Sequence, residues 1–263
     1  MRVNLFQVDA FTSIAFRGNP AAVCLLNTPA DDEWMQSLAA EMNLSETAFL
    51  LPEGDGWNLR WFTPKTEVDL CGHATLASAR VLFELQPELR KTSLVFETLS
   101  GRLLARWVDD LVELDFPAMV FQVFNPEDGV SKALGFEPVA AVCSGNYFLF
   151  EAAEEDLVCR AQVDIQALAR LPMPEVIITA TSKDPAYDFI SRFFAPQLGV
   201  DEDPVTGSAH CLLAPYWAQK QGKRDFRAFQ ASSRGGVLDL QLEGERVRIR
   251  GEARIIFRAE LLV

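Results

Sequence analysis

The 263-residue chain has only two histidines, His73 and His210, and it is short of positive charge. Its 24 lysines and arginines face 37 aspartates and glutamates, which gives a formal net charge of −13. This balance argues against nonspecific binding to nucleic acids or to anionic membrane surfaces. Long apolar runs are lacking as well, since none approaches the roughly 18 residues that a transmembrane helix needs.

Several chemical motifs are missing too. The five cysteines form no C-x-x-C pair, and their odd number does not suit a disulfide framework, so we expect a protein of the reducing cytoplasm. No phosphate-binding loop or G-x-G-x-x-G follows a strand, and no zinc-type spacing of histidines or cysteines occurs. The sequence therefore predicts neither a nucleotide nor a metal site. Residues 1–8 read as a strand rather than a signal peptide.

What is present is the composition of an ordinary globular protein, with 49% hydrophobic and 23% charged residues. The length fits one large domain or two of about 130 residues. Short strands joined by tight turns favour antiparallel or mixed sheets over a doubly wound sheet.

Helices are predicted at 32–42, 73–84, 165–170 and 207–220. Strands are predicted at 3–8, 21–26, 47–51, 57–62, 93–98, 102–108, 111–115, 138–143, 146–151, 175–181, 187–194, 236–242, 245–250 and 252–258.

Two short motifs match each other, one in each half. Residues 71–75 read Cys-Gly-His-Ala-Thr and residues 206–210 read Thr-Gly-Ser-Ala-His, and each opens a predicted helix. A helix start presents unpaired N–H groups and the positive end of the helix dipole, which suit an anion such as a carboxylate. We therefore expect a pseudo-symmetric protein that binds a small acid.

Glu46 and His73 are the first candidates for chemistry. Glu46 precedes an apolar strand, where partial desolvation would suit a carboxyl group to general acid/base work; the alternative is a surface glutamate. His73 at a helix start can donate a ring N–H to an anion or act as an acid; the alternative is a histidine bonded to local backbone. His210, one turn into its helix, is expected to be structural.

The acids Asp201, Glu202 and Asp203 precede the second helix, where they complement its dipole or orient a partner in a site. Ser208 caps that helix or donates to a ligand oxygen. Cys71 and His73 are not expected to form a nucleophile pair, because residues two apart on a helix point in different directions.

Six segments together carry a family resemblance: 8–12, 16–23, 45–49, 62–64, 67–75 and 202–209. The chain resembles the phenazine-biosynthesis PhzF-like family, relatives of diaminopimelate epimerase, over nearly its whole length. The resemblance implies an α+β fold of two pseudo-symmetric domains, 1–118 and 119–263, with the active site in the cleft between them. Each domain would have a mixed, mainly antiparallel sheet wrapped around a central helix, and a terminal strand could cross over.

The resemblance also implies roles for residues. Glu46 would be the acid/base that moves a proton, and His73 and Asp203 would line the site as catalytic residues. Backbone N–H groups at Gly72–His73 and at Gly207–Ser208 would hold a substrate carboxylate. The best-understood chemistry of the family is isomerisation of a dihydro-hydroxyanthranilate, without metal or organic cofactor. A homodimer is implied as well.

Three functions stay open from the sequence. The first is an isomerase that moves a proton on a small cyclic or unsaturated carboxylic acid. The second is a family member that binds a small molecule or a protein without catalysis. The third is an amino-acid epimerase or racemase with Cys71 and Glu46 as unequal bases. The two-thiol mechanism of the epimerase relatives is disfavoured, because the position matching Cys71 in the second motif is Thr206.

Overall fold

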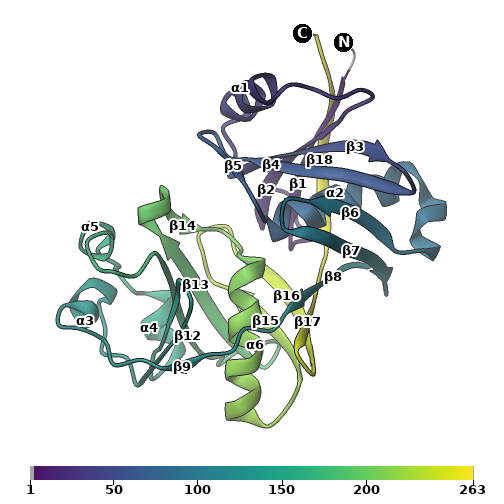
Figure 1. Ribbon diagram of the computed structural model, residues 1–263. Helices are drawn as coiled ribbons and strands as arrows, with labels where there is room; N and C mark the ends of the chain where they lie inside the picture. Colours follow the sequence, from purple (N-terminus) through teal and green to yellow (C-terminus); the bar gives the residue numbers. More distant parts are fainter. Residues whose placement is uncertain (1–2, 263) are drawn as a thin grey trace. The chain divides into compact units, whose positions relative to one another are not determined.

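The structure is a computed structural model that describes residues 3–262 (Figure 1). The chain divides into two compact units, one of Met1–Asp115 with Ile249–Val263 and one of Phe116–Arg248. None of the helices within 3–262 is long and apolar enough to cross a membrane.

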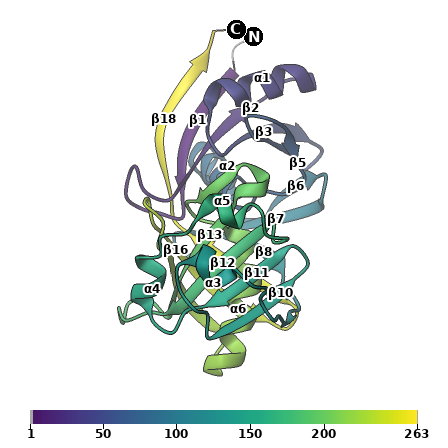
Figure 2. The same cartoon turned by 90° about the vertical axis from the view of Figure 1, so that its left-hand side faces the viewer.

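The first unit contains these elements: β1 Val3–Ala10, β2 Asn19–Leu25, α1 Asp32–Met42, β3 Glu46–Glu53, β4 Gly56–Phe62, β5 Glu67–Val68, α2 Gly72–Leu85, the 3-10 helix η1 Pro87–Lys91, β6 Leu94–Thr98, β7 Gly101–Val108, β8 Leu111–Pro117 and β18 Ala253–Leu261. The strands pair in the order β18-β1-β2-β3-β4-β6-β7-β8, with β5 beside β4. The pairs β2–β3 and β4–β6 are parallel and the others antiparallel. Figure 2 shows β18 running beside β1.

Helix α2 is the centre of this unit. It contacts β1, β2, β3, β7 and β18, strands from both ends of the pairing order, so the sheet curls around it. Small residues such as Ala74, Ala77 and Ala79 let the strands approach closely, and all three are buried. The buried hydroxyls of Thr75 and Ser78 donate to the carbonyls four residues earlier, at 2.6 and 2.7 Å, so the buried helix leaves neither hydroxyl unpaired.

Helix α1 covers the outer face of β3 and β4. The Asp31 carboxylate accepts the N–H of Trp34 at 2.7 Å and caps the helix, as its position before an apolar-periodic run predicts. Met35 and Leu38 pack with Phe49 and Phe62 in a hydrophobic cluster. This layer fixes β3, the strand that begins at Glu46.

The second unit contains β9 Gln122–Val123, α3 Val130–Leu134, β10 Ala140–Ser144, β11 Tyr147–Glu151, α4 Glu155–Cys159, α5 Ile165–Leu168, β12 Glu175–Thr181, β13 Phe189–Ala195, the 3-10 helix η2 Pro196–Leu198, β14 Val200–Asp203, α6 Gly207–Gln221, β15 Asp225–Gln230, β16 Gly236–Glu243 and β17 Arg246–Gly251. Its strands pair as β9-β10-β11-β12-β13-β15-β16, with β14 beside β13.

The two units repeat one pairing pattern. In each, an antiparallel pair is followed by a parallel pair, an antiparallel pair with a short extra strand, a parallel pair and a final antiparallel pair. The long helix, α2 or α6, follows the short strand in both. Each unit therefore has the mixed sheet expected from the sequence, and the two units share one topology, as a pseudo-symmetric fold requires.

Some expected elements differ. No strand was expected at 199–204, but residues 200–203 form β14 against β13. No strand was expected at 225–230, where β15 lies parallel to β13. The short helices α3 and α4 were not expected either.

Candidate active site

Glu46 and His73 come together in the first unit. Glu46 is the first residue of β3 and His73 the second residue of α2, and the start of α2 is held by the strands that pack around it. The Oε2 atom of Glu46 lies 3.2 Å from Nε2 of His73, and their side chains are only 18% and 7% exposed. Two groups chosen separately from the sequence thus form one buried pair.

The other ring nitrogen of His73 is held by Asn19. The Nδ2 atom of Asn19 lies 3.2 Å from Nδ1 of His73, and the Ser45 hydroxyl lies 3.5 Å from Oδ1 of Asn19. Since an amide nitrogen can only donate, Nδ1 accepts and the proton of the neutral ring is assigned to Nε2, facing Glu46. Asn19 was not expected as a site residue from the sequence, although it lies in the segment 16–23 that carries the family resemblance.

The Glu46–His73 pair keeps capacity for a ligand. Although the two atoms are at ion-pair distance, neither Glu46 Oε2 nor His73 Nε2 completes a well-aligned hydrogen bond within the described residues, and both atoms are buried. Buried polar atoms in this state are uncommon in folded proteins and mark positions where a bound group can complete the bonding.

Electrostatics favour a protonated His73. Burial acts to lower the pKa of His73, but the neighbouring Cys71 and Glu46 outweigh it and raise the pKa well above the usual value of 6.5. Burial, followed by the charge of Glu46, raises the pKa of the Cys71 thiol. The two neighbours, Cys71 first and Glu46 second, therefore stabilise the charged form of His73.

The prediction that the side chains of Cys71 and His73 point apart is wrong. The Cys71 sulfur lies 3.5 Å from Nδ1 of His73. Cys71 is the N-cap, with extended angles of φ −144° and ψ 109°, so the helical spacing rule does not apply to it.

Glu46, Cys71 and His73 also form a group of three possible metal-ligand atoms within 4.8 Å of one another. However, His73 turns one ring nitrogen to Glu46 and the other to Cys71. The ring therefore lies between Glu46 and Cys71, and a single ion would use only one of its two nitrogens.

The second unit places Asp203 at the end of β14, close to the start of α6. The Thr206 hydroxyl donates to the Asp203 carboxylate. Gln230, fully buried on β15, accepts the Thr206 N–H at 2.8 Å and donates to the Asp203 carbonyl at 2.8 Å. Gln230 was not expected, because only the unrecognised strand β15 brings it here.

Both long helices begin without a side-chain cap. Cys71 and Thr206 occupy the N-cap positions, and neither side chain makes a capping hydrogen bond to a backbone N–H group of its helix. The N–H groups that follow, from Gly72 and from Gly207 onward, therefore have no capping oxygen. These starts suit an anion, as the matching motifs predict. His210 instead faces inward, with Nδ1 bonded to the Thr206 carbonyl at 2.8 Å.

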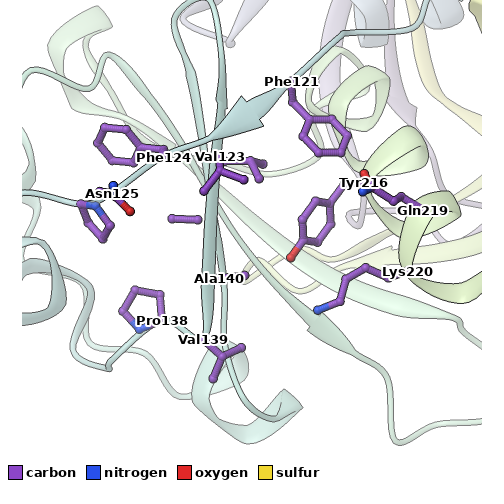
Figure 3. A pocket seen from close by; sticks show the side chains of 13 residues that line it. Phe121, Val123, Phe124, Asn125, Pro138, Val139, Ala140, Tyr216, Gln219 and Lys220 are labelled. Carbon is purple, nitrogen blue, oxygen red and sulfur yellow. The ribbon is translucent and has the colours of Figure 1, made fainter.

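The second unit also has a cavity of about 610 Å³ beside α6 (Figure 3). Tyr216 and Lys220 project toward Ala140 there, and Phe121 and Phe124 form another part of the wall. Lys220 pairs with the carboxylate of Glu151, which also accepts the Tyr216 hydroxyl. The lysine charge is thus matched inside the protein, and no residue chosen from the sequence lines this cavity.

Comparison with known proteins agrees with these features. The family model described as phenazine biosynthesis-like protein matches residues 8–259. A protein from Halalkalibacterium halodurans named an uncharacterized isomerase is 48% identical over 265 residues, which cover 100% of both chains. A PhzF-family crystal structure from Enterococcus faecalis superposes with a TM-score of 0.96 at 39% identity, covering 100% of both chains.

The fold extends to epimerases. A hydroxyproline epimerase structure from Agrobacterium vitis shares it with a TM-score of 0.63 at 14% identity, over 99% of this chain and 92% of that one. With the motif set, the repeated sheet pattern and the whole-length match in place, the chain belongs to the phenazine biosynthesis-like protein family.

Proposed function

We propose that the protein is an isomerase that moves a proton on a small cyclic or unsaturated carboxylic acid, with Glu46 as the acid/base. The buried contact between Glu46 and His73 carries this proposal. Support comes from relatives named as isomerases and from the family itself.

The chemistry needs one carboxyl group. A C–H bond beside a conjugated carboxylate breaks as Glu46 takes the proton, and the bonding electrons move into the conjugated system. Glu46 then returns the proton to another carbon, and the double bond shifts. His73, with its raised pKa, donates from Nε2 to the negative charge that passes between substrate and Glu46. No metal or organic cofactor is required for this sequence of steps.

Substrate binding is proposed at the uncapped helix starts. The N–H groups at Gly72 and His73 of α2, and at Gly207 and Ser208 of α6, suit carboxylate oxygens. Asp203 holds the Thr206 hydroxyl away from a capping position, which keeps the start of α6 open. A homodimer in the cytoplasm remains our expectation for the assembly and its location.

Proton NMR in deuterated water tests the proposal. A panel of cyclic and amino carboxylic acids is incubated with the wild-type protein and with Glu46→Gln, which keeps the side-chain shape but cannot take a proton. We expect isomer formation or deuterium uptake by at least one acid, lowered by about 100-fold or more in Glu46→Gln. Glu53→Gln, exposed at the far end of the same strand, is the matched control and should behave as wild type.

If Glu46→Gln turns over as fast as the wild type, Glu46 is not the acid/base. If acids bind without exchange in the wild type, as seen by line broadening, the protein is a binding member of the family and the proposal fails.

A further inference from the structure

An arginine holds the short extra strand of each unit. In the first unit, Arg60 of β4 binds Glu67 of β5, with Nε 2.6 Å from Oε1 and Nη2 2.7 Å from Oε2. In the second unit, Arg192 of β13 binds Glu202 of β14 through the same four atoms, at 2.7 and 2.9 Å. A two-point contact between guanidinium and carboxylate fixes orientation as well as distance. The two units thus contain the same arginine–glutamate pair.

The third nitrogen of each arginine binds the layer of helices. Nη1 of Arg60 donates to the carboxylate of Asp32, the first residue of α1, at 2.7 Å. Nη1 of Arg192 donates to the carbonyls of Val158, in α4, and Ala161, at 3.2 and 3.0 Å. Each arginine therefore joins its short strand both to the neighbouring strand and to a helix.

The arginines also pack in the same way. Cζ of Arg60 lies 5.2 Å from the ring centre of Phe62, and Cζ of Arg192 lies 5.0 Å from that of Phe194. A guanidinium over an aromatic face gains a further attraction. The side chains of the two arginines are only 25% and 14% exposed. Both arginines are therefore held in place within the protein before any ligand binds.

The backbone register is the same at both places. The residue after each arginine pairs with the residue after each glutamate, namely Trp61 with Val68 and Phe193 with Asp203 (Figure 1). This backbone pairing is brief, because β5 has two residues and β14 has four, with a shift in register. The arginine therefore supplies a large part of what fixes each short strand to its neighbour.

Both short strands lead directly to a helix start. Glu67 lies five residues before Gly72, the first residue of α2, and Glu202 lies five residues before Gly207, the first residue of α6. Neither helix start has a side-chain cap. Because no cap fixes the first turn, the segment before it orients the N–H groups that follow. A movement of the short strand would therefore reach those groups.

We propose that Arg60 and Arg192 are positioning residues for carboxylate binding. Through Glu67, Arg60 keeps the start of α2 in the geometry that binds a carboxylate. Arg192 does the same for the start of α6 through Glu202. This inference rests on the proposed function, in which those helix starts bind the substrate. It gives the arginine–glutamate pairs no part in proton transfer, which is assigned to Glu46.

The two histidines report on the two helix starts separately. His73 is the second residue of α2, while His210 of α6 binds the carbonyl of the N-cap Thr206 through Nδ1 at 2.8 Å. With both rings labelled with nitrogen-15, we expect Arg60→Lys to shift the His73 resonances and leave those of His210 in place. Arg192→Lys should do the reverse. Lysine keeps the charge of arginine but cannot make the two-point contact.

Two further variants make the test specific. Glu67→Gln weakens the contact from the other side and leaves Arg60 paired with Asp32, so it should shift His73 as Arg60→Lys does. Arg102→Lys is the matched control. Arg102 binds Glu97 across the hairpin of β6 and β7 at 2.8 Å, but it is 67% exposed and its strand leads to no helix. This control should shift neither histidine.

Sodium benzoate serves as the carboxylate probe, and the shift of His73 on its addition gives an apparent affinity. We expect Arg60→Lys and Glu67→Gln each to weaken this affinity about tenfold, the loss expected for one hydrogen bond to a charged group. The double variant should lose no more than the larger single effect, because both substitutions remove one contact. Arg102→Lys should bind benzoate as the wild type does.

A merely structural ion pair would give another pattern. Arginine variants that are less stable in urea but leave both histidines and the benzoate affinity unchanged would overturn the proposal, as would equal shifts in Arg102→Lys. Additive losses in the double variant would overturn the assignment of one shared contact. Failure of the proposed function is distinct, because no acid would then exchange a proton and benzoate would not bind the wild type, while the histidine shifts in the arginine variants would persist.

Discussion

At the residue scale, His73 links three side chains through two nitrogens. Nε2 faces Glu46, while Nδ1 faces Asn19 and the Cys71 sulfur. When the ring gains a second proton, Nδ1 can no longer accept from Asn19, and the Cys71 sulfur becomes its available acceptor. Cys71 therefore supports the charged form of His73, and its raised pKa makes it a poor base at neutral pH.

Replacing Cys71 by serine separates these roles. We expect Cys71→Ser to keep most of the proton-exchange activity, because serine can also accept from Nδ1 and no thiolate is needed. Exchange rates in deuterated water provide the measurement. A loss comparable to that of Glu46→Gln would instead favour an epimerase in which Cys71 and Glu46 act as two unequal bases.

Acid stability provides a second residue-scale prediction. Burial lowers the pKa of His210 to about 4, so the folded protein binds fewer protons than the unfolded chain between pH 4 and 6.5. Stability is full above pH 6.5 and falls as the pH drops, by about 3 kcal/mol in total from this group. Urea unfolding at pH 7 and 4.5 measures the unfolding free energy lost on acidification. We expect a smaller loss in His210→Gln than in the wild type. An equal loss in both proteins would contradict the assignment.

At the element scale, the turn before β2 positions Asn19 for His73. Gly18 has φ +64°, and an added Cβ would lie 2.1 Å from the Ala10 carbonyl oxygen and 2.7 Å from Cγ2 of Thr12. Only glycine fits a positive φ with backbone this close. The same turn therefore shapes the active site.

Gly18→Ala should cost about 1–3 kcal/mol of unfolding free energy and reduce activity, because the backbone must move and Asn19 moves with it. Gly54→Ala is the matched control. Gly54 has φ +56° but open space around its Cβ position, so it carries the strain of the angle without the clash. Equal losses in urea unfolding for the two variants would show that the close contact at Gly18 is unimportant.

The elements also show how far the sequence predicts the fold. The strongly apolar strand at 47–51 and the alanine-rich helix at 73–84 were predicted close to β3 and α2. Strand β15 was not, because Asp225 and Arg227 leave only a short alternation around Phe226 and Ala228. Gln230 was missed along with it. Polar partners such as Asn19 and Gln230 depend on which strands pair, and no local pattern reports that.

At the scale of the whole molecule, the last strand returns to the first unit. Strand β18 pairs along the full length of β1, from Val3 opposite Leu261 to Ala10 opposite Ala253. Arg80 of α2 also donates to the Ala253 carbonyl at 3.2 Å. The first unit is thus built from both ends of the sequence, with the strand Ala253–Leu261 beside Val3–Ala10.

The most direct measurement of the central claim is histidine NMR, since the chain has only His73 and His210. With both rings labelled with nitrogen-15, we predict that His73 titrates well above 6.5, that Glu46→Gln lowers this pKa, and that His210 titrates near 4 in both proteins. Such a result would show that Glu46 and His73 form one charged acid/base pair. A His73 resonance that titrates at its ordinary value, or that ignores the Glu46→Gln substitution, would contradict the account.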